Sequence, residues 1–252
     1  MTQAKKEYSL VTERSKFRYP SFSRPIIAIL GGFGSGKTEV SVNLAKYLAS
    51  TGDESVAIVD FDLVNPYFRS REAIKEMESL GIRVIAPRGE NYYSELPILL
   101  PEVKGAIENR DGIVILDIGG DAQGTKALGS ISEVFQPDTY DMLMVLNSRR
   151  PQTSDVDRCI KTMQRIEITA GLKFSGLISN SHMIDETDAD VIHEGYNLAI
   201  DVSRVSGLPL VFVSAKNEAL ELVNAKDFEC PVLPLTRSML KPWERQTGKN
   251  KI

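Results

Sequence analysis

The chain alternates short apolar segments with segments of helical periodicity, and this alternation limits its fold more than any other feature of the sequence. Seven segments have the length of a strand and are rich in Val, Ile and Leu: Ile26–Leu30, Ser55–Asp60, Arg83–Ala86, Gly112–Asp117, Asp141–Leu146, Phe174–Ser179 and Leu208–Val213. Nearly continuous apolar runs are typical of strands in a sheet that is covered on both faces. The pattern predicts a three-layer α/β fold, in which helices cover both faces of a mostly parallel central sheet of about seven strands.

Two of the intervening helices can be bounded from the sequence. After Ser154, apolar residues recur at intervals of three and four until Gly171, which predicts a helix that ends there. Cys159 lies on the apolar face of this helix and is expected in the core. In the segment that begins TDADVIHEGY, Thr187 and Asp190 suggest a capping box at the start of a second helix.

Composition argues against several classes of protein. A net charge of −4 gives no clear signal for nucleic-acid binding, and the 2 cysteines and 2 histidines disfavour a zinc or iron–sulfur site. No apolar run approaches the roughly 20 residues of a membrane span, and the first residues lack the apolar core of a signal peptide. We therefore predict a cytoplasmic protein with one domain over residues 25–236, a polar extension over 1–24 and a basic tail over 237–252.

A glycine-rich loop follows the first predicted strand and opens a helix. Its sequence, GGFGSGKT over Gly31–Thr38, fits G-x-x-x-x-G-K-[ST], whereas the dinucleotide fingerprint G-x-G-x-x-G fits in no register. Glycines let several backbone N–H groups surround a phosphate, a lysine binds the β- and γ-phosphates, and a threonine hydroxyl binds Mg²⁺. The loop predicts a nucleoside-triphosphate site. Its expected contacts are Gly32, Phe33, Gly34, Ser35, Gly36, Lys37, Thr38 and Glu39.

Two predicted strands end in carboxylates. The sequence VAIVDFDLVNP places Asp60 and Asp62 at the end of one strand, and GIVILDIGGDAQG places Asp117 at the end of another. Because parallel strands end at the same edge of a sheet, these side chains are expected to face the phosphate loop. Hydrolysis of a triphosphate needs carboxylates that hold the metal and orient the attacking water. The sequence therefore predicts a Mg²⁺ site beside the loop.

These motifs resemble the MinD/ParA-type members of the SIMIBI class of P-loop NTPases, over residues from about 25 to about 217. IVDFDLVNPYF is similar to the D-x-D element of that group, and ILDIGG to its D-x-x-G element. The resemblance implies that Asp60 lies just outside the ligands of Mg²⁺, that Asp117 holds the metal through water, and that Asp62 orients the attacking water. It also implies that the N–H of Gly120 contacts the γ-phosphate. Lys37 and Asp62 are then the predicted catalytic residues.

One position departs from this resemblance. Members that work as ATP-sandwich dimers carry a second lysine five residues before the P-loop lysine, and this chain has Gly32 there. The sequence still allows a homodimer, but it does not support one in which this second lysine reaches the nucleotide of the partner. Another cation would have to neutralise the charge of the transition state. The candidates are Arg69, Arg71, Arg149 and Arg150.

The sequence predicts that the bound nucleotide carries adenine as its base. At the strand end LISNSHMIDETD, Asn180 is present but the remainder of the guanine motif N-K-x-D is not. The sequence resembles MinD/ParA-type ATPases in this respect, since they use an asparagine at this strand end to contact adenine. An asparagine amide offers both a donor and an acceptor, which suits N6 and N1 of adenine. Within VSAKN, residues Ser214–Asn217 resemble the S-A-K element of small GTPases and keep GTP as the less favoured nucleotide.

Three functions fit this site. The first is a Mg-ATPase that acts as a switch on a protein partner, with NPYFRSRE and GENYYSELPILLPEVKG as responsive or partner-facing segments. In the second of these segments the apolar run Leu96–Leu100 is either an exposed contact or a buried connection. The second function is an ATP-dependent small-molecule kinase or ligase of the dethiobiotin-synthetase or CobQ type. The third is a nucleotide-sensing module with little turnover.

Overall fold

The computed structural model describes residues 16–52, 54–61, 71–87, 92–183 and 186–238. Within these residues eight strands form one sheet in the order β3-β2-β4-β1-β5-β6-β7-β8, and every neighbouring pair is parallel. The strands are β1 (Ile26–Gly31), β2 (Ser55–Phe61), β3 (Ile82–Ile85), β4 (Gly112–Ile118), β5 (Tyr140–Leu146), β6 (Gly176–Ser179), β7 (Leu210–Lys216) and β8 (Val232–Leu235). The predicted α/β fold with a parallel sheet is confirmed.

All seven predicted strands are present, and the structure adds an eighth. β8 is four residues long, contains Pro234 and pairs with β7 at one edge of the sheet. Its shortness and its proline hid it from the sequence pattern, because proline cannot donate to a strand ladder and is confined to edge strands or bulges.

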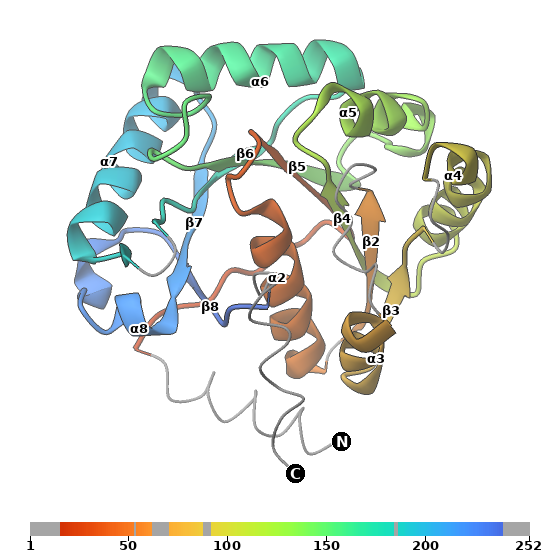
Figure 1. The fold of residues 1–252 in the computed structure, drawn as a ribbon, viewed down its shortest axis with the longest axis horizontal. Helices are drawn as coiled ribbons and strands as arrows, with labels where there is room; N and C mark the ends of the chain where they lie inside the picture. Colours follow the sequence, from red (N-terminus) through yellow and green to blue (C-terminus); the bar gives the residue numbers. More distant parts are fainter. Residues whose placement is uncertain (1–15, 53, 62–70, 88–91, 184–185, 239–252) are drawn as a thin grey trace, which may run out of the picture.

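Helices cover both faces of the sheet, as predicted (Figure 1). Buried side chains of α4, α5, α6 and α7 form one cluster with the sheet, and those of α2 and α3 form another on the opposite face. The helices are α2 (Lys37–Thr51), α3 (Arg71–Ser79), α4 (Tyr92–Glu108), α5 (Ala122–Gly129), α6 (Val156–Ala170), α7 (Ala189–Ser206) and α8 (Asn217–Leu220), with 3-10 turns η2 (Ser132–Val134) and η4 (Ala225–Asp227).

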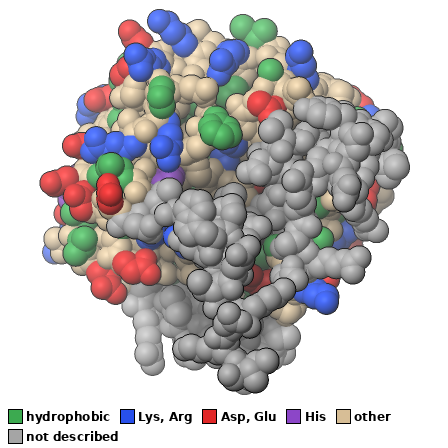
Figure 2. Space-filling view, viewed as in Figure 1, with side chains coloured by type: hydrophobic (Ala, Val, Ile, Leu, Met, Phe, Trp, Pro, Cys, Tyr) green, Lys and Arg blue, Asp and Glu red, His purple; other side chains and the backbone are tan. Residues whose placement is uncertain are grey.

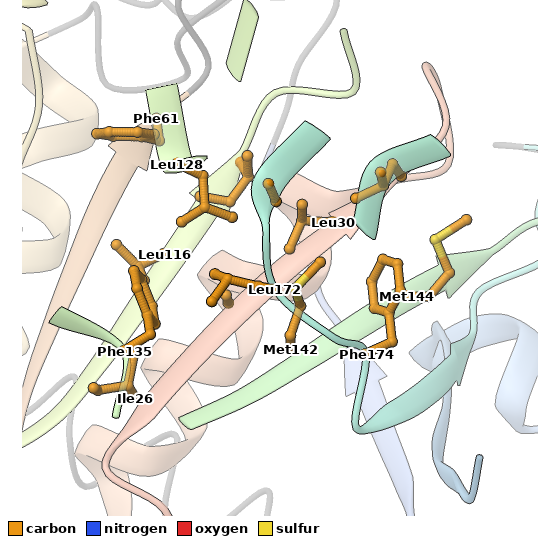
Figure 3. Packing of buried hydrophobic residues seen from close by; sticks show 14 of the residues in the cluster. Ile26, Leu30, Phe61, Leu116, Leu128, Phe135, Met142, Met144, Leu172 and Phe174 are labelled. Atoms are coloured by element: carbon orange, nitrogen blue, oxygen red, sulfur yellow. The ribbon is translucent and has the colours of Figure 1, made fainter. Parts of the chain in front are cut away.

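The larger cluster fills the space between the sheet and the helices α4 to α7. Figure 3 shows Leu30, Leu116 and Met142, from three neighbouring strands, pointing into it together with Leu128 of α5. These four side chains are at most 1% exposed. Cys159 belongs to the same cluster, as expected from its place on the apolar face of α6.

The two predicted helix boundaries have different outcomes. α6 ends as predicted, with Gly171 in the left-handed region at φ 67°. The capping box at the start of α7 is wrong: the side chain of Asp188 accepts the N–H of Val191 at 2.9 Å, while the Thr187 hydroxyl accepts the N–H of Met183 at 2.9 Å. Asp188 is thus the N-cap, so α7 begins one residue later than the predicted capping box requires.

Residues 16–24 of the predicted N-terminal extension pack on the domain. The Arg18 carbonyl accepts the N–H of Val232 at 2.8 Å, and the ring of Tyr19 stacks on Tyr47 of α2 with 4.7 Å between centroids. The remainder of that extension, and the predicted tail from residue 239 onward, lie outside the described residues. Among the helices of the described part, none is long and apolar enough to span a membrane.

The partner-facing segments fall partly outside the description. NPYFRSRE lies outside the described residues except for the start of α3, and the second segment forms α4 from Tyr92 onward. Leu100 packs against the large core cluster. Figure 2 shows the face of the molecule that is seen in Figure 1, and on its described part Lys and Arg side chains lie among Asp and Glu side chains.

Candidate functional site

The glycine loop joins β1 to α2 as the motif requires. Gly34 and Gly36 have φ angles of 72° and 88°, in the left-handed region that favours glycine. The Ser35 N–H donates to the Gly32 carbonyl at 3.2 Å, and α2 begins at Lys37 with Gly36 as its N-cap. The loop thus combines left-handed backbone turns with a helix N-terminus, an arrangement that binds anions.

Lys37 and Gly120 meet at the head of this loop. Lys37 is 7% exposed, and its Nζ donates to the Gly32 carbonyl at 3.2 Å. A Cβ added to Gly120 would lie 2.8 Å from Lys37 Nζ and 2.9 Å from the Gly31 carbonyl oxygen. The backbone of Gly120 therefore packs directly against the loop. A side chain at this position would collide with the loop, so the close packing requires a glycine.

The two described aspartates lie side by side on neighbouring strands. Asp60 of β2 is paired in register with Asp117 of β4, and the two side chains are 0% and 1% exposed. The Ser41 hydroxyl lies 2.9 Å from the Lys37 carbonyl and 3.2 Å from Asp117 Oδ1, which ties α2 to the end of β4. Asp62 lies outside the described residues.

This donor set fits Mg²⁺ bound together with a nucleotide. No group of three or more His, Cys, Asp or Glu side chains that could hold a metal by itself occurs in the described part of the chain. Mg²⁺ is commonly bound through one or two carboxylates plus substrate phosphates. Asp60, Asp117 and the Thr38 hydroxyl at the start of α2 could supply the protein's share.

Asn180 connects the loop to β6 and β7. Its Nδ2 donates to the Ser35 carbonyl at 2.8 Å, and its Oδ1 accepts the Ser214 hydroxyl at 3.0 Å. The side chain is 1% exposed. The structure therefore brings together Asn180, the phosphate loop and Ser214 of the VSAKN segment, and Asn180 holds the loop directly.

The loop between β5 and α6 supplies contacts that the sequence did not predict. Gln152 Oε1 accepts the N–H of Phe33 at 3.2 Å, and Arg150 Nε donates to the Gly34 carbonyl at 2.7 Å. Arg150 was one of the four candidate cations predicted from the sequence, whereas Gln152 was not predicted. The sequence offered only that this loop follows the carboxyl end of a predicted parallel strand, and the pairing of that strand with β1 came from the structure.

His182 lies against the same loop. A Cβ added to Gly36 would lie 3.1 Å from His182 Nε2. Burial lowers the pKa of His182 to about 4, with smaller contributions from the charges of Arg150 and Lys216. The imidazole is therefore neutral at neutral pH.

Four buried polar atoms at this edge have no hydrogen-bond partner among the described residues: Ser35 Oγ, Asn147 Nδ2, Ser148 Oγ and His182 Nε2. Buried polar groups are normally hydrogen-bonded. Together with the loop they fit a polar ligand that lies across the ends of β1, β5 and β6.

The remaining predicted contacts lie in different surroundings. Phe33 is 76% exposed at the tip of the loop. The Glu39 carboxylate accepts the backbone N–H of Ser238 at 2.9 and 3.0 Å, so it faces the segment after β8. Arg149 forms an ion pair with Glu194 of α7, and Arg69 lies outside the described residues.

Comparison with known proteins places this site in a sequence family. The profile of the CobQ/CobB/MinD/ParA nucleotide binding domain matches residues 26–201, which include the loop, both strand-end aspartates and Asn180. Comparison with curated proteins found no match.

Solved structures share the fold at low identity. The cell division protein FtsY from Thermotoga maritima is 19% identical over 87% of this chain and 71% of its own, with a TM-score of 0.50. Chloroplast FtsY from Physcomitrella patens is 18% identical over 89% of this chain and 71% of its own, with a TM-score of 0.52. The signal recognition particle 54 kDa protein from Aeropyrum pernix, in complex with GDP, is 20% identical over 83% of this chain and 46% of its own, with a TM-score of 0.51.

Proposed function

We propose a function from one premise: this chain belongs to the CobQ/CobB/MinD/ParA nucleotide binding domain family, a group of SIMIBI-class P-loop NTPases. The proposed function is Mg-dependent binding and hydrolysis of a nucleoside triphosphate, with ATP as the first choice. The observation that carries it is the approach of Gly120 to Lys37 at the head of a glycine loop, beside two paired aspartates.

The residues take the following proposed roles. Backbone N–H groups of the loop and the charge of Lys37 bind the β- and γ-phosphates. Thr38 and Asp117 would hold the Mg²⁺, with Asp60 just outside its ligands, and the bound metal would neutralise developing negative charge. Asp62 orients the attacking water, and the N–H of Gly120 donates to the γ-phosphate.

ATP is proposed because the guanine motif is incomplete after Asn180. A second candidate, GTP, is supported by the hydrogen bond between Asn180 and Ser214, which joins the two segments that resemble parts of a guanine site. A structural neighbour was solved with GDP. Calorimetry with ADP and with GDP distinguishes the two, since a clear preference for GDP would reverse the assignment.

The proposed purpose of hydrolysis is to switch the binding of a protein partner through segments near the phosphates. Steady release of phosphate without a second substrate would support this switch over a kinase or ligase. Tight binding without detectable release would instead favour a nucleotide-sensing module.

Lys37→Ala tests the nucleotide site. Each charge-assisted hydrogen bond from Lys37 contributes about 1.5–3 kcal/mol, so the variant should bind Mg-ATP at least about 10-fold more weakly. The measurement is calorimetry on a variant whose unfolding temperature has been checked against the parent. Unchanged affinity would contradict the proposed site.

A further inference from the structure

The loop over residues 147–155, between β5 and α6, is folded against the phosphate loop. The Arg150 N–H donates to the Asn147 carbonyl at 3.0 Å, and the Thr153 hydroxyl donates to the same carbonyl at 2.8 Å. The Gln152 side chain fills the space beside Gly32, where an added Cβ would lie 2.7 Å from its Oε1. These bonds hold Arg150 in place before any ligand arrives.

Arg150 reaches the phosphate loop with most of its hydrogen-bonding capacity unused. Its Nε donates to the Gly34 carbonyl at 2.7 Å. A guanidinium carries five N–H donors, so the four on its two terminal nitrogens remain. In the described part of the chain no Asp or Glu forms an ion pair with Arg150.

The neighbouring arginine provides a contrast. Arg149 pairs with Glu194 of α7, so its charge is matched within the fold. Arg150 lies beside backbone groups of a loop whose expected ligand carries three to four negative charges. Guanidinium groups bind phosphate oxygens through two parallel hydrogen bonds, which a lysine cannot do.

We propose that Arg150 contacts the phosphate oxygens of the bound nucleotide, as a cation supplied by the same chain that supplies the phosphate loop. The contact would add a second positive charge to that of Lys37. The inference rests on the proposed nucleotide site, and it selects Arg150 over Arg149 as the functional cation of this loop.

Three variants test this contact: Arg150→Gln removes the charge, Arg150→Lys keeps it without the planar fork, and Arg149→Gln is the matched control. Binding of fluorescent analogues of Mg-ATP and Mg-GTP and release of phosphate are measured on the full chain. For Arg150→Gln we expect about 10-fold weaker binding of the triphosphate and about 100-fold slower turnover. Arg150→Lys should fall between this variant and the parent, and Arg149→Gln should match the parent.

The outcomes separate this inference from the proposed function. If the parent chain binds neither nucleotide, the proposed function fails and the contact with it. If the parent binds and hydrolyses but Arg150→Gln stays within about twofold of it, Arg150 does not contact phosphate. Equal losses in Arg150→Gln and Arg149→Gln would likewise overturn the inference, because they would reflect general disruption of the loop. If Arg150→Gln fails to fold, Arg150→Lys decides, with a loss of turnover above about 10-fold expected.

Discussion

The hydrogen bonds of Asn180 make a prediction that does not depend on any ligand. Asn180→Ala removes the donor to the Ser35 carbonyl and the acceptor for the Ser214 hydroxyl, at a side chain that is 1% exposed. Each lost bond costs about 1 kcal/mol, and leaving the Ser35 carbonyl unpaired adds about 1 kcal/mol or more. Ser214 keeps a second acceptor in the Ser179 carbonyl at 3.3 Å, so no further penalty is counted for it.

The free energy of unfolding should therefore fall by about 3 kcal/mol, which for a domain of this size lowers the unfolding temperature by about 6–12 °C. Urea unfolding of the nucleotide-free protein, followed by circular dichroism, measures this change.

Two further variants sharpen the test. Ser214→Ala leaves the bond to Ser35 intact but leaves the buried Asn180 Oδ1 unpaired, so it should cost about 2 kcal/mol. Asn180→Asp keeps the size but places an acceptor opposite the Ser35 carbonyl, so it should destabilise at least as much as Asn180→Ala. A loss below about 0.5 kcal/mol for Asn180→Ala would refute the view that this side chain holds the loop to the sheet.

Two other predictions concern the same edge of the sheet. Burial lowers the pKa of His182 from its ordinary value to about 4. Between about pH 6.5 and pH 4 this imidazole is therefore protonated in the unfolded chain but neutral in the folded one. The free energy of unfolding should fall as the pH drops through that range. Between about pH 7.5 and pH 5, the free energy of unfolding measured in urea should fall by about 2 kcal/mol less in His182→Gln than in the parent. An unchanged pH dependence would contradict the lowered pKa. Gly195→Ala in α7 would place a Cβ 2.2 Å from the Ser181 hydroxyl oxygen and should cost about 1–3 kcal/mol. Its control, Gly105→Ala in α4, meets nothing within 4 Å and should stabilise by up to about 1 kcal/mol; equal effects of the two substitutions would show that packing at Gly195 is not tight.

Much of the fold was determined by local sequence patterns. The apolar runs reflect burial on both faces of the sheet, so the seven predicted strands are present, with ends that shift by two residues or fewer except at β7. Gly171 could be placed because a left-handed helix end favours glycine. The nearness of Asp60 and Asp117 also followed from sequence, since parallel strands end at one edge. Their roles at Mg²⁺ stay predictions.

Only the tertiary structure decided which distant segments meet the phosphate loop. Strand order places β5 beside β1, and this brings Gln152 and Arg150 to the backbone of Phe33 and Gly34. It also turns Asn180 toward the Ser35 carbonyl. These contacts join residues more than 100 positions apart in the chain. Spacing within a segment reports which face of a strand or helix is buried, but the partner of a polar side chain depends on which strands become neighbours.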